Sequence, residues 1–491
     1  MKTLVIAEKP SVARDIARVL GCAKKENGAL EGNQYIVTWA LGHLVTLKDP
    51  EDYDKKYKEW NMAVLPMMPE KLQIKVIPQT GKQYHAVTTQ LARKDVGEVV
   101  IATDAGREGE LVARWILDKA HNQKPCKRLW ISSVTDKAIR EGFASLKDAK
   151  EYDNLYRAAV SRAEADWLVG INATRALTCK YNAQLSCGRV QTPTLAMIAQ
   201  REQEIREFVP KPYYTVTAAA GGAVYTWKDE KSGGTRISDP EKAKQIAEKA
   251  KRYPLVLQKV EKKKKQKEAP LLYDLTELQR DASARFGYSA KQTLNLMQSL
   301  YETHKVLTYP RTDSRYLTKD IVPTLKERLD AVSIGPYKTL AQQAKRRPLK
   351  EKPGFVNDAK VSDHHAIIPT EQYVQLSALS NEERRIYDLV VRRFLAVLLP
   401  PCVYEETVIQ ASIEKECFTA RGKRMVEKGW QEAYEDNRYD DEDEAKEEVR
   451  EQNLPLLQAG MKFDQSKISL REGKTKPPAR FTEGTLLSAM E

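Results

Sequence analysis

The stretch "EVVIATDAGREGELVARWILDKA", residues 98–120, decides the fold of the first part of the chain. It opens with a β-branched apolar run, which predicts a short buried strand. From Arg107 onward the pattern changes, and Leu111, Trp115 and Ile116 fall on one face of a helix. The stretch therefore predicts a strand, a turn rich in charged residues, and an amphipathic helix.

The same order of strand and helix occurs at two other places in the first 150 residues. "TLVIA", residues 3–7, predicts a buried strand, and Ser11 can cap the helix that follows. The apolar face of that helix consists of Val12, Ile16, Val19 and Leu20. "RLWISSV", residues 128–134, leads into another amphipathic helix. This alternation predicts an α/β domain built on a doubly wound parallel sheet.

The rest of the chain predicts helical and β regions in turn. Residues 151–200 have a mostly helical pattern, and residues 213–260 are strand-like. A helical block begins near residue 273, and "CVYEETVIQASI", residues 402–413, is again strand-like. The two β regions on either side of the helical block predict one β domain interrupted by a helical insertion.

The composition indicates a soluble globular protein of about three or four domains. The 491 residues are 41% hydrophobic and 30% charged, and no apolar run approaches the roughly 18 residues of a membrane span. Glu8 and Lys9 interrupt the first apolar run, so it does not resemble a signal peptide. The six cysteines form no C-x-x-C pair, which argues against a zinc ribbon or a disulfide framework. We expect a cytoplasmic protein.

The charge points to a polyanionic partner. The formal net charge is +13, and nucleic acid is the simplest partner for such a protein. The lysine run "EKKKKQKEAP", residues 261–270, could contact phosphate or form a solvated linker. The acidic run "YEDNRYDDEDEAKEE", residues 434–448, is expected to be a solvated loop.

Carboxylates follow two of the predicted strands. Glu8 comes directly after the first strand, Asp104 comes directly after the second, and Glu108 lies four residues further on. Ligands bind at the carboxyl ends of strands in open α/β sheets, and three carboxylates there suit Mg²⁺ that retains some of its waters. Lys9 and Arg107 offset part of the charge. Glu108 taken alone could instead be an acid favoured by the dipole at the start of a helix.

No nucleotide-hydrolysis motif occurs in the sequence. "GKT", residues 473–475, lacks the glycine that a P-loop has five residues before Gly473, and "GREGE" is not G-x-G-x-x-G. We therefore expect a reaction that does not use ATP.

The segment "VLTYPRTDSRYL", residues 306–317, contains a candidate nucleophile. Tyr309 would need cationic help, because a phenol has a pKa of about 10. Arg311 can contact a phosphate oxygen through its guanidinium, and Pro310 keeps Tyr309 out of helical geometry. We expect Tyr309 to be exposed for attack on a phosphodiester. Such a phosphotyrosine link would conserve the bond energy for resealing. The alternative is that Tyr309 simply packs, like most of the 22 tyrosines.

Two further segments contain candidate phosphate or nucleic-acid contacts. His364 and His365 in "DHHAIIPT" cannot both face inward in a regular element, so we expect one to act on phosphate or a proton and the other to be structural. Arg189 and Gln191 precede a helix that "TPT", residues 192–194, can start, which suits a nucleic-acid backbone. Ordinary surface and packing roles remain open for these residues.

Together the motifs resemble those of the type IA DNA topoisomerases, most closely their bacterial topoisomerase III members. "VIAEKPSVA" and "IATDAGREGELVA" are similar to that family's two Toprim motifs. The further similar blocks, in chain order, are "SRAEADWLVGINATRA", "SCGRVQTPTL", "LYDLTELQRDA", "QSLYE", "LTYPRTDSRYL", "HHAIIPT" and "KPPARFTEGTLLSAME". The resemblance covers essentially the whole chain.

The resemblance implies a toroidal protein of four domains that acts as a monomer near the bacterial nucleoid. It implies a substrate of single-stranded and negatively supercoiled DNA, which the enzyme relaxes or decatenates. The implied domains are a Toprim domain (1–150), a helical DNA-binding domain (151–212 plus 455–491), a β arch (213–272 plus 401–454) and a helical domain with the nucleophile (273–400).

The resemblance also implies roles for individual residues. Tyr309 would attack one strand and become joined to its 5′ phosphate, and Arg311 would stabilise the transition state. Glu8 would lie between the metal and the leaving 3′ oxygen, Lys9 would contact the scissile phosphate, and His364 would help to hold it. The implied Mg²⁺ ligands are Glu8, Asp104 and Glu108. The implied DNA contacts are Arg162, Arg175, Arg189, Gln191 and Thr192.

The sequence departs from the family pattern at one position. Many relatives have D-x-D-x-E in the second Toprim motif, whereas Gly106 replaces the middle acid here. The chain also ends at Glu491, inside a block beyond which relatives ordinarily continue. Two other classes of protein stay open. A Toprim nuclease or primase would share the carboxylates, and a non-enzymatic single-strand binding protein would share the charge.

Overall fold

The computed structural model describes residues 1–347, 354–361, 363–434 and 451–490. Most of the acidic run, residues 435–448, lies outside them, as does the expectation of a solvated loop there. Within the described residues, no helix is both long enough and apolar enough to cross a membrane.

A seven-stranded sheet forms the core of the N-terminal part. Its central strands β4, β1, β7 and β8 are parallel, and its edge strands pair antiparallel. The strands in spatial order are β2 (Lys24–Glu26), β3 (Ala29–Glu31), β4 (Tyr35–Trp39), β1 (Lys2–Ala7), β7 (Val96–Ala102), β8 (Cys126–Arg128) and β9 (Lys147–Asp148). The predicted parallel sheet is confirmed.

Helices cover both faces of this sheet, as a doubly wound fold requires. Buried residues of α1 (Pro10–Val19) and α4 (Asp136–Ala144) pack on one face. Those of α2 (Gly81–Leu91) and α3 (Arg107–Lys119) pack on the other. One local prediction is wrong. Ser11 does not cap α1, because the helix already begins at Pro10 with Lys9 at the cap position.

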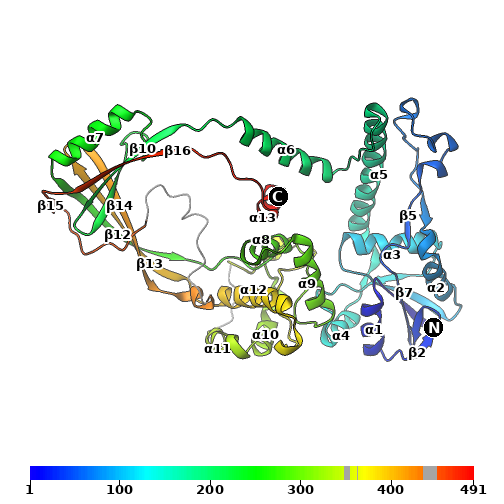
Figure 1. Cartoon of the computed structure of the whole chain (residues 1–491). Helices are drawn as coiled ribbons and strands as arrows, with labels where there is room; N and C mark the ends of the chain where they lie inside the picture. The colour runs from blue at the N-terminus through cyan, green and yellow to red at the C-terminus, as the bar shows by residue number, and fades with distance from the viewer. Residues whose placement is uncertain (348–353, 362, 435–450, 491) are drawn as a thin grey trace.

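Two long helices lead away from the N-terminal part. Figure 1 shows α5 (Asp153–Tyr181) rising from the sheet and α6 (Gln191–Glu207) continuing toward the far end of the molecule. An excursion from the small sheet of β5 (Val45–Leu47) and β6 (Ile74–Val76) runs beside α5.

The second large sheet combines strands from distant parts of the sequence. Strand β12 pairs antiparallel with β13 although a helical block of the chain separates them. Helix α7 (Pro240–Arg252) packs in the core of this sheet. The strands in spatial order are β15 (Lys462–Phe463), β12 (Leu255–Lys267), β13 (Cys402–Ile413), β14 (Glu416–Glu427), β11 (Ala223–Trp227), β10 (Pro212–Ala220) and β16 (Lys467–Lys474).

The lysine run is part of a strand and not a linker. Lys262 to Lys265 lie in β12, opposite residues of β13 that include two glutamates. Lys263 is directly opposite Glu406, and Lys265 forms a 2.5 Å ion pair with the same carboxylate. Because opposite charges across a ladder stabilise a sheet, the exposed lysines are compatible with a strand. The linker interpretation is therefore wrong.

A helical part with its own core completes the chain. It contains α8 (Leu275–Phe286), α9 (Ala290–Glu302), α10 (Leu325–Ala331), α11 (Lys338–Lys345) and α12 (Asn381–Leu398). Helix α13 (Glu483–Met490) packs against α8. Figure 1 shows the chain passing from the N-terminal sheet through α5 and α6 to the second sheet and on into the helical part, which lies beside the N-terminal part and closes a ring. This circuit is the toroidal architecture that was expected.

Candidate active site

The carboxyl ends of β1 and β7 bring Glu8 and Asp104 together. The backbone N–H of Asp104 donates to Oε2 of Glu8 at 3.1 Å. The loop after β7 lies tightly against α3, because a Cβ at Gly109 would approach the Asp104 carbonyl oxygen to 1.9 Å. The hydroxyl of Thr103 also donates to the Gly109 carbonyl at 2.7 Å. A glycine at position 109 is therefore what lets the acidic loop and the helix meet.

Burial gives these two carboxylates unusual acidities. It raises the pKa of Glu8 to about 7, and the charge of Asp104 adds to the increase. Burial also raises the pKa of Asp104, while Lys9 opposes the change. Two buried acids in contact form a site that a cation or a proton would stabilise. This donor set fits the Mg²⁺ that the Toprim motifs imply.

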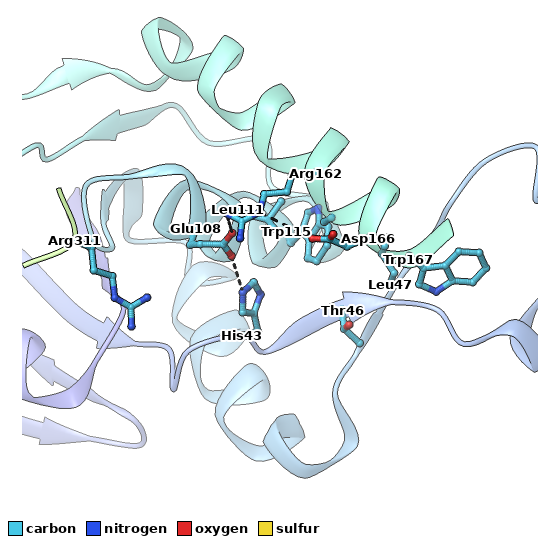
Figure 2. Close-up of a pocket in the computed structure, with 11 residues that line it drawn as sticks. His43, Thr46, Leu47, Glu108, Leu111, Trp115, Arg162, Asp166, Trp167 and Arg311 are labelled. Carbon is cyan, nitrogen blue, oxygen red and sulfur yellow. Dashed lines mark ion pairs between the residues drawn. The ribbon is translucent and has the colours of Figure 1, made fainter. Parts of the chain in front are cut away.

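Glu108 is not part of this pair. It lies in the first turn of α3, with Oε2 3.5 Å from Nε2 of His43 and Oε1 3.3 Å from Arg162 (Figure 2). The described residues contain no group of three His, Cys, Asp or Glu side chains arranged to hold a metal ion. The expected cluster of three carboxylates is thus not assembled in this conformation, because Glu108 contacts His43 and Arg162 instead.

Gly106 leaves room for the acid that it replaces. Its φ of 174° is extended backbone that any residue adopts, and an added Cβ would have no neighbour within 4 Å. The absence of a middle carboxylate is therefore not a steric requirement of the loop.

Tyr309 meets the two acids from the other side. Its hydroxyl donates to Oδ2 of Asp104 at 3.5 Å, and its backbone N–H donates to the Ser132 carbonyl at 2.9 Å. The ring packs edge-on against Tyr301 and lies 4.4 Å from the ring of His364, centroid to centroid. The segment is non-helical, as predicted.

The expectation that Tyr309 is exposed is wrong. Only 7% of the residue is accessible, because its ring is part of the apolar cluster on the α1 face of the sheet. Burial raises the pKa of Tyr309 well above its usual value, and the charges of Asp104 and Glu8 add to the effect. Arg311 acts in the opposite direction. In this conformation the phenol is held protonated.

A cavity of about 600 Å³ is lined by Glu108 and by Arg311, which lies two residues after Tyr309. Figure 2 shows Arg311 entering it from the tyrosine segment, opposite His43 and Glu108, with Arg162 contributed by α5. Four separate segments of the chain therefore place polar groups around one cavity. Its two arginines are suited to a phosphate backbone, although two carboxylates, Glu108 and Asp166, also line it.

Lys9 has a partner that sequence reasoning missed. Its Nζ lies 3.9 Å from Oδ2 of Asp104 and forms an ion pair with Glu302, which also accepts from Gln298. Glu302 is the last residue of α9 and ends the block "QSLYE". Because Glu302 lies within a block shared with the family, the sequence could have suggested it as a functional residue.

His364 is held as a neutral imidazole. Ser132 donates its hydroxyl to Nδ1 at 2.9 Å, and Nε2 donates to the Ala105 carbonyl. The ring is stacked at 13° to Trp130 with centroids 6.0 Å apart. Burial lowers the pKa of His364 to about 4, so it is uncharged at neutral pH. Ser132 and Trp130 were also missed, because only the fold brings "RLWISSV" against this histidine.

The expectation that only one histidine faces inward is wrong. His364 is 2% exposed and His365 is 6% exposed. The rule of alternating faces applies to regular elements, and both histidines lie in irregular backbone. His365 contacts the carbonyl of Ala366, and burial lowers its pKa to about 4 as well.

The predicted DNA contacts do not form one set. Arg162 and Arg189 are both partly exposed and share Asp166, with Arg189 at 2.6 Å. Gln191 and Thr192 are exposed at the start of α6.

Arg175 differs from the other predicted contacts because it is only 5% exposed, and its contact with DNA stays a prediction. It donates to the Tyr57 carbonyl at 2.5 Å, and its guanidinium lies over the ring of Trp60. The excursion beside α5 therefore covers Arg175, which the sequence could not show.

Comparisons with known proteins agree with this architecture. The pattern of the DNA topoisomerase family matches residues 150–491, and that of the Toprim domain matches residues 3–134. The protein named DNA topoisomerase 3 from Bacillus subtilis (strain 168) is 59% identical over 490 residues, which cover 100% of this chain and 67% of that relative. The protein of the same name from Bacillus anthracis is 59% identical over 491 residues, with the same coverage.

A solved structure shows the same fold. The full-length topoisomerase I from Thermotoga maritima superposes with a TM-score of 0.72 at 23% identity, over 99% of this chain and 74% of that one. Family patterns and long, highly identical relatives agree with it. The chain therefore belongs to the type IA DNA topoisomerase family, whose members change the topology of DNA without ATP.

Proposed function

We propose that the chain cuts one DNA strand with Tyr309, holds it as a 5′-phosphotyrosine link, lets another strand pass and then reseals the break. The observation that carries the proposal is the junction of Tyr309 with Glu8 and Asp104. The phenol hydroxyl lies 3.5 Å from one of two buried acids, and Arg311, two residues further on, lines a cavity. Together they supply a nucleophile, proton acceptors and a cation for in-line transfer of a phosphodiester.

The transfer is balanced by the groups around it. The Tyr309 oxygen forms a bond to phosphorus while the bond from phosphorus to the 3′ oxygen breaks. The phenol proton passes to Asp104, its hydrogen-bond partner. Glu8, protonated below its pKa of about 7, donates a proton to the leaving 3′ oxygen. Resealing reverses each transfer, which is why no ATP is required.

The cations stabilise charge on the phosphate. Arg311 contacts the equatorial oxygens, and Lys9 turns from Glu302 to the scissile phosphate. His364 is neutral and donates through Nε2, so it can hold a phosphate oxygen once that N–H leaves the Ala105 carbonyl.

Glu8 and Asp104 would hold Mg²⁺, with Glu108 joining them after it turns away from His43 and Arg162. Bound there, the ion would orient phosphate and offset the charge of the acids.

The proposed DNA contacts are the predicted residues whose side chains are exposed or partly exposed. Arg162, Arg189, Gln191 and Thr192 are the proposed contacts for single-stranded or negatively supercoiled DNA, and the chain would work as a monomer.

The functional division of the chain is proposed as Toprim domain 1–150, DNA-binding helices 151–212 with 455–491, β arch 213–272 with 401–454, and the tyrosine domain 273–400.

The decisive experiment is a denaturant quench of a reaction with end-labelled single-stranded DNA. We expect protein joined covalently to a 5′ end, and no adduct with Tyr309→Phe. Cleavage without any adduct would assign the site to a Toprim nuclease. DNA binding with neither cleavage nor adduct would leave a single-strand binding protein.

A further inference from the structure

The N-terminal part and the helical part meet at a seam. We define the seam as the contact between residues 1–150 and residues 273–400. The backbone does not pass directly from one to the other, since it first travels through α5, α6 and β10 to β12 (Figure 1). Separation at the seam would therefore break side-chain contacts and a few hydrogen bonds, but would not stretch the chain.

Part of the seam consists of groups already placed around Tyr309. Outside that site, two ion pairs between described residues cross the seam. Nζ of Lys305 lies 2.6 Å from Oδ1 of Asp15 on α1, and Nζ of Lys137 on α4 lies 2.7 Å from Oε2 of Glu327 on α10. Each pair joins one helix of the N-terminal part to the helical part.

The two pairs differ in how strongly they should act. The side chains of Lys305 and Asp15 are 20% and 21% exposed, so the pair is largely shielded from water. Those of Lys137 and Glu327 are 44% and 56% exposed. Exposed ion pairs contribute little and are screened by salt, whereas shielded pairs are screened less. The pair of Asp15 should therefore hold the seam more firmly than the pair of Lys137.

We propose that the ion pairs Asp15–Lys305 and Lys137–Glu327 form a latch that sets how often the seam opens. This proposal rests on the proposed function, because strand passage needs an opening at the seam. The latch residues do not touch the reacting groups. They change how often Tyr309 becomes accessible, and leave the chemistry of cutting unchanged.

One backbone amide reports the state of the seam directly. The N–H of Tyr309 donates to the Ser132 carbonyl across the seam, whereas the neighbouring N–H of Thr308 donates to Ile368 inside the helical part. The Tyr309 amide should exchange with solvent each time the seam opens, and the Thr308 amide only when the helical part itself unfolds. The pair provides a probe and its internal reference.

The test is hydrogen exchange at single-residue resolution on the DNA-free protein. Asp15→Asn should speed exchange at the Tyr309 amide by at least about fivefold, because a shielded pair should contribute no less than the strongest exposed pairs, and should leave Thr308 unchanged. Lys137→Met should have a smaller effect in the same direction. The double variant Lys137→Glu with Glu327→Lys swaps the two charges of the pair. It should return hydrogen exchange at the Tyr309 amide toward the wild-type rate.

A matched control lies elsewhere on the N-terminal part. Asp95 pairs with Arg93 at 2.8 Å, and both residues belong to the N-terminal part. Asp95→Asn removes an equivalent charge without touching the seam and should leave Tyr309 exchange unchanged. Equal exchange at Tyr309 in Asp15→Asn and wild type, or an equal increase in Asp95→Asn, would overturn the latch. Because the measurement uses no DNA, its failure would not count against the proposed cleavage reaction, nor would a failed cleavage assay count against the latch.

Discussion

Replacing Glu8 by glutamine should make the metal-free protein more stable near neutral pH. The pKa of Glu8 is about 7 in the folded protein and 4.5 without the environment of the site. The folded state therefore binds more protons than the unfolded state between these values, and stability falls as pH rises through that window. The two pKa values correspond to a penalty of about 3 kcal/mol above pH 7.

Glutamine removes this penalty because it is neutral at every pH. Glu8→Gln should therefore raise the unfolding free energy by up to about 3 kcal/mol at about pH 8, and the difference should shrink as pH falls toward about 4.5. The assay is urea unfolding with chelator present. Following hydrogen exchange at the amides of β1 restricts the measurement to the N-terminal part. Added Mg²⁺ should reverse the order, because it stabilises only the carboxylate form.

Glu108 offers a matched control of opposite sign. The hydrogen bond with His43, helped by Arg162, lowers the pKa of Glu108. Glu108→Gln should therefore give no stabilisation near neutral pH. The reasoning would be refuted if Glu8→Gln were no more stable than wild type in chelator at high pH. It would also be refuted if Glu8→Gln and Glu108→Gln changed the unfolding free energy by the same amount.

Three further outcomes are expected. Tyr309→Phe should abolish the covalent adduct and relaxation while single-strand affinity stays within about twofold, because phosphate contacts dominate binding; residual adduct would identify another nucleophile. Gly106→Asp should lower the Mg²⁺ concentration for half-maximal relaxation, since the loop has space for a further ligand; an unchanged requirement would place the ion elsewhere. Arg189→Ala should weaken DNA binding and reduce the slope of log affinity against log salt concentration by about 0.7. Arg175→Ala should instead mainly destabilise the excursion beside α5, which urea unfolding would measure. An equal loss of DNA affinity in the two variants would contradict their different exposure.

The sequence predicts features that depend on local pattern. Glu8 and Asp104 could be paired in advance because each directly follows a strand, and parallel strands end at the same edge. The position of Glu108 could not, since it depends on His43 and on Arg162 of α5, which only the fold brings near. The resemblance named Tyr309 but said nothing of its burial, which comes from a contact with residues around Ser132, 177 positions earlier in the sequence.

Exposure was the property that local pattern predicted least well. Arg175 looked like a DNA contact, yet the excursion that includes Trp60 covers it. Lys262 to Lys265 looked like a linker, yet glutamates on β13 make them compatible with a strand. In each case a partner distant in the sequence decides the outcome, and no periodicity within the segment carries that information.

The burial of the site and the opening of the seam are two aspects of one constraint. While the seam is closed, Tyr309 and the acid pair are shielded from water, and burial is the largest cause of the raised pKa of both Tyr309 and Glu8. Opening admits water and a phosphate backbone, which lowers the cost of a phenolate beside Arg311 and of a charged Glu8. In the proposed reaction, the Tyr309 phenol is therefore least reactive while the seam is closed and no DNA is bound. An enzyme that cuts and reseals DNA gains from this coupling, because resealing would restore the closed seam and its protonated tyrosine together.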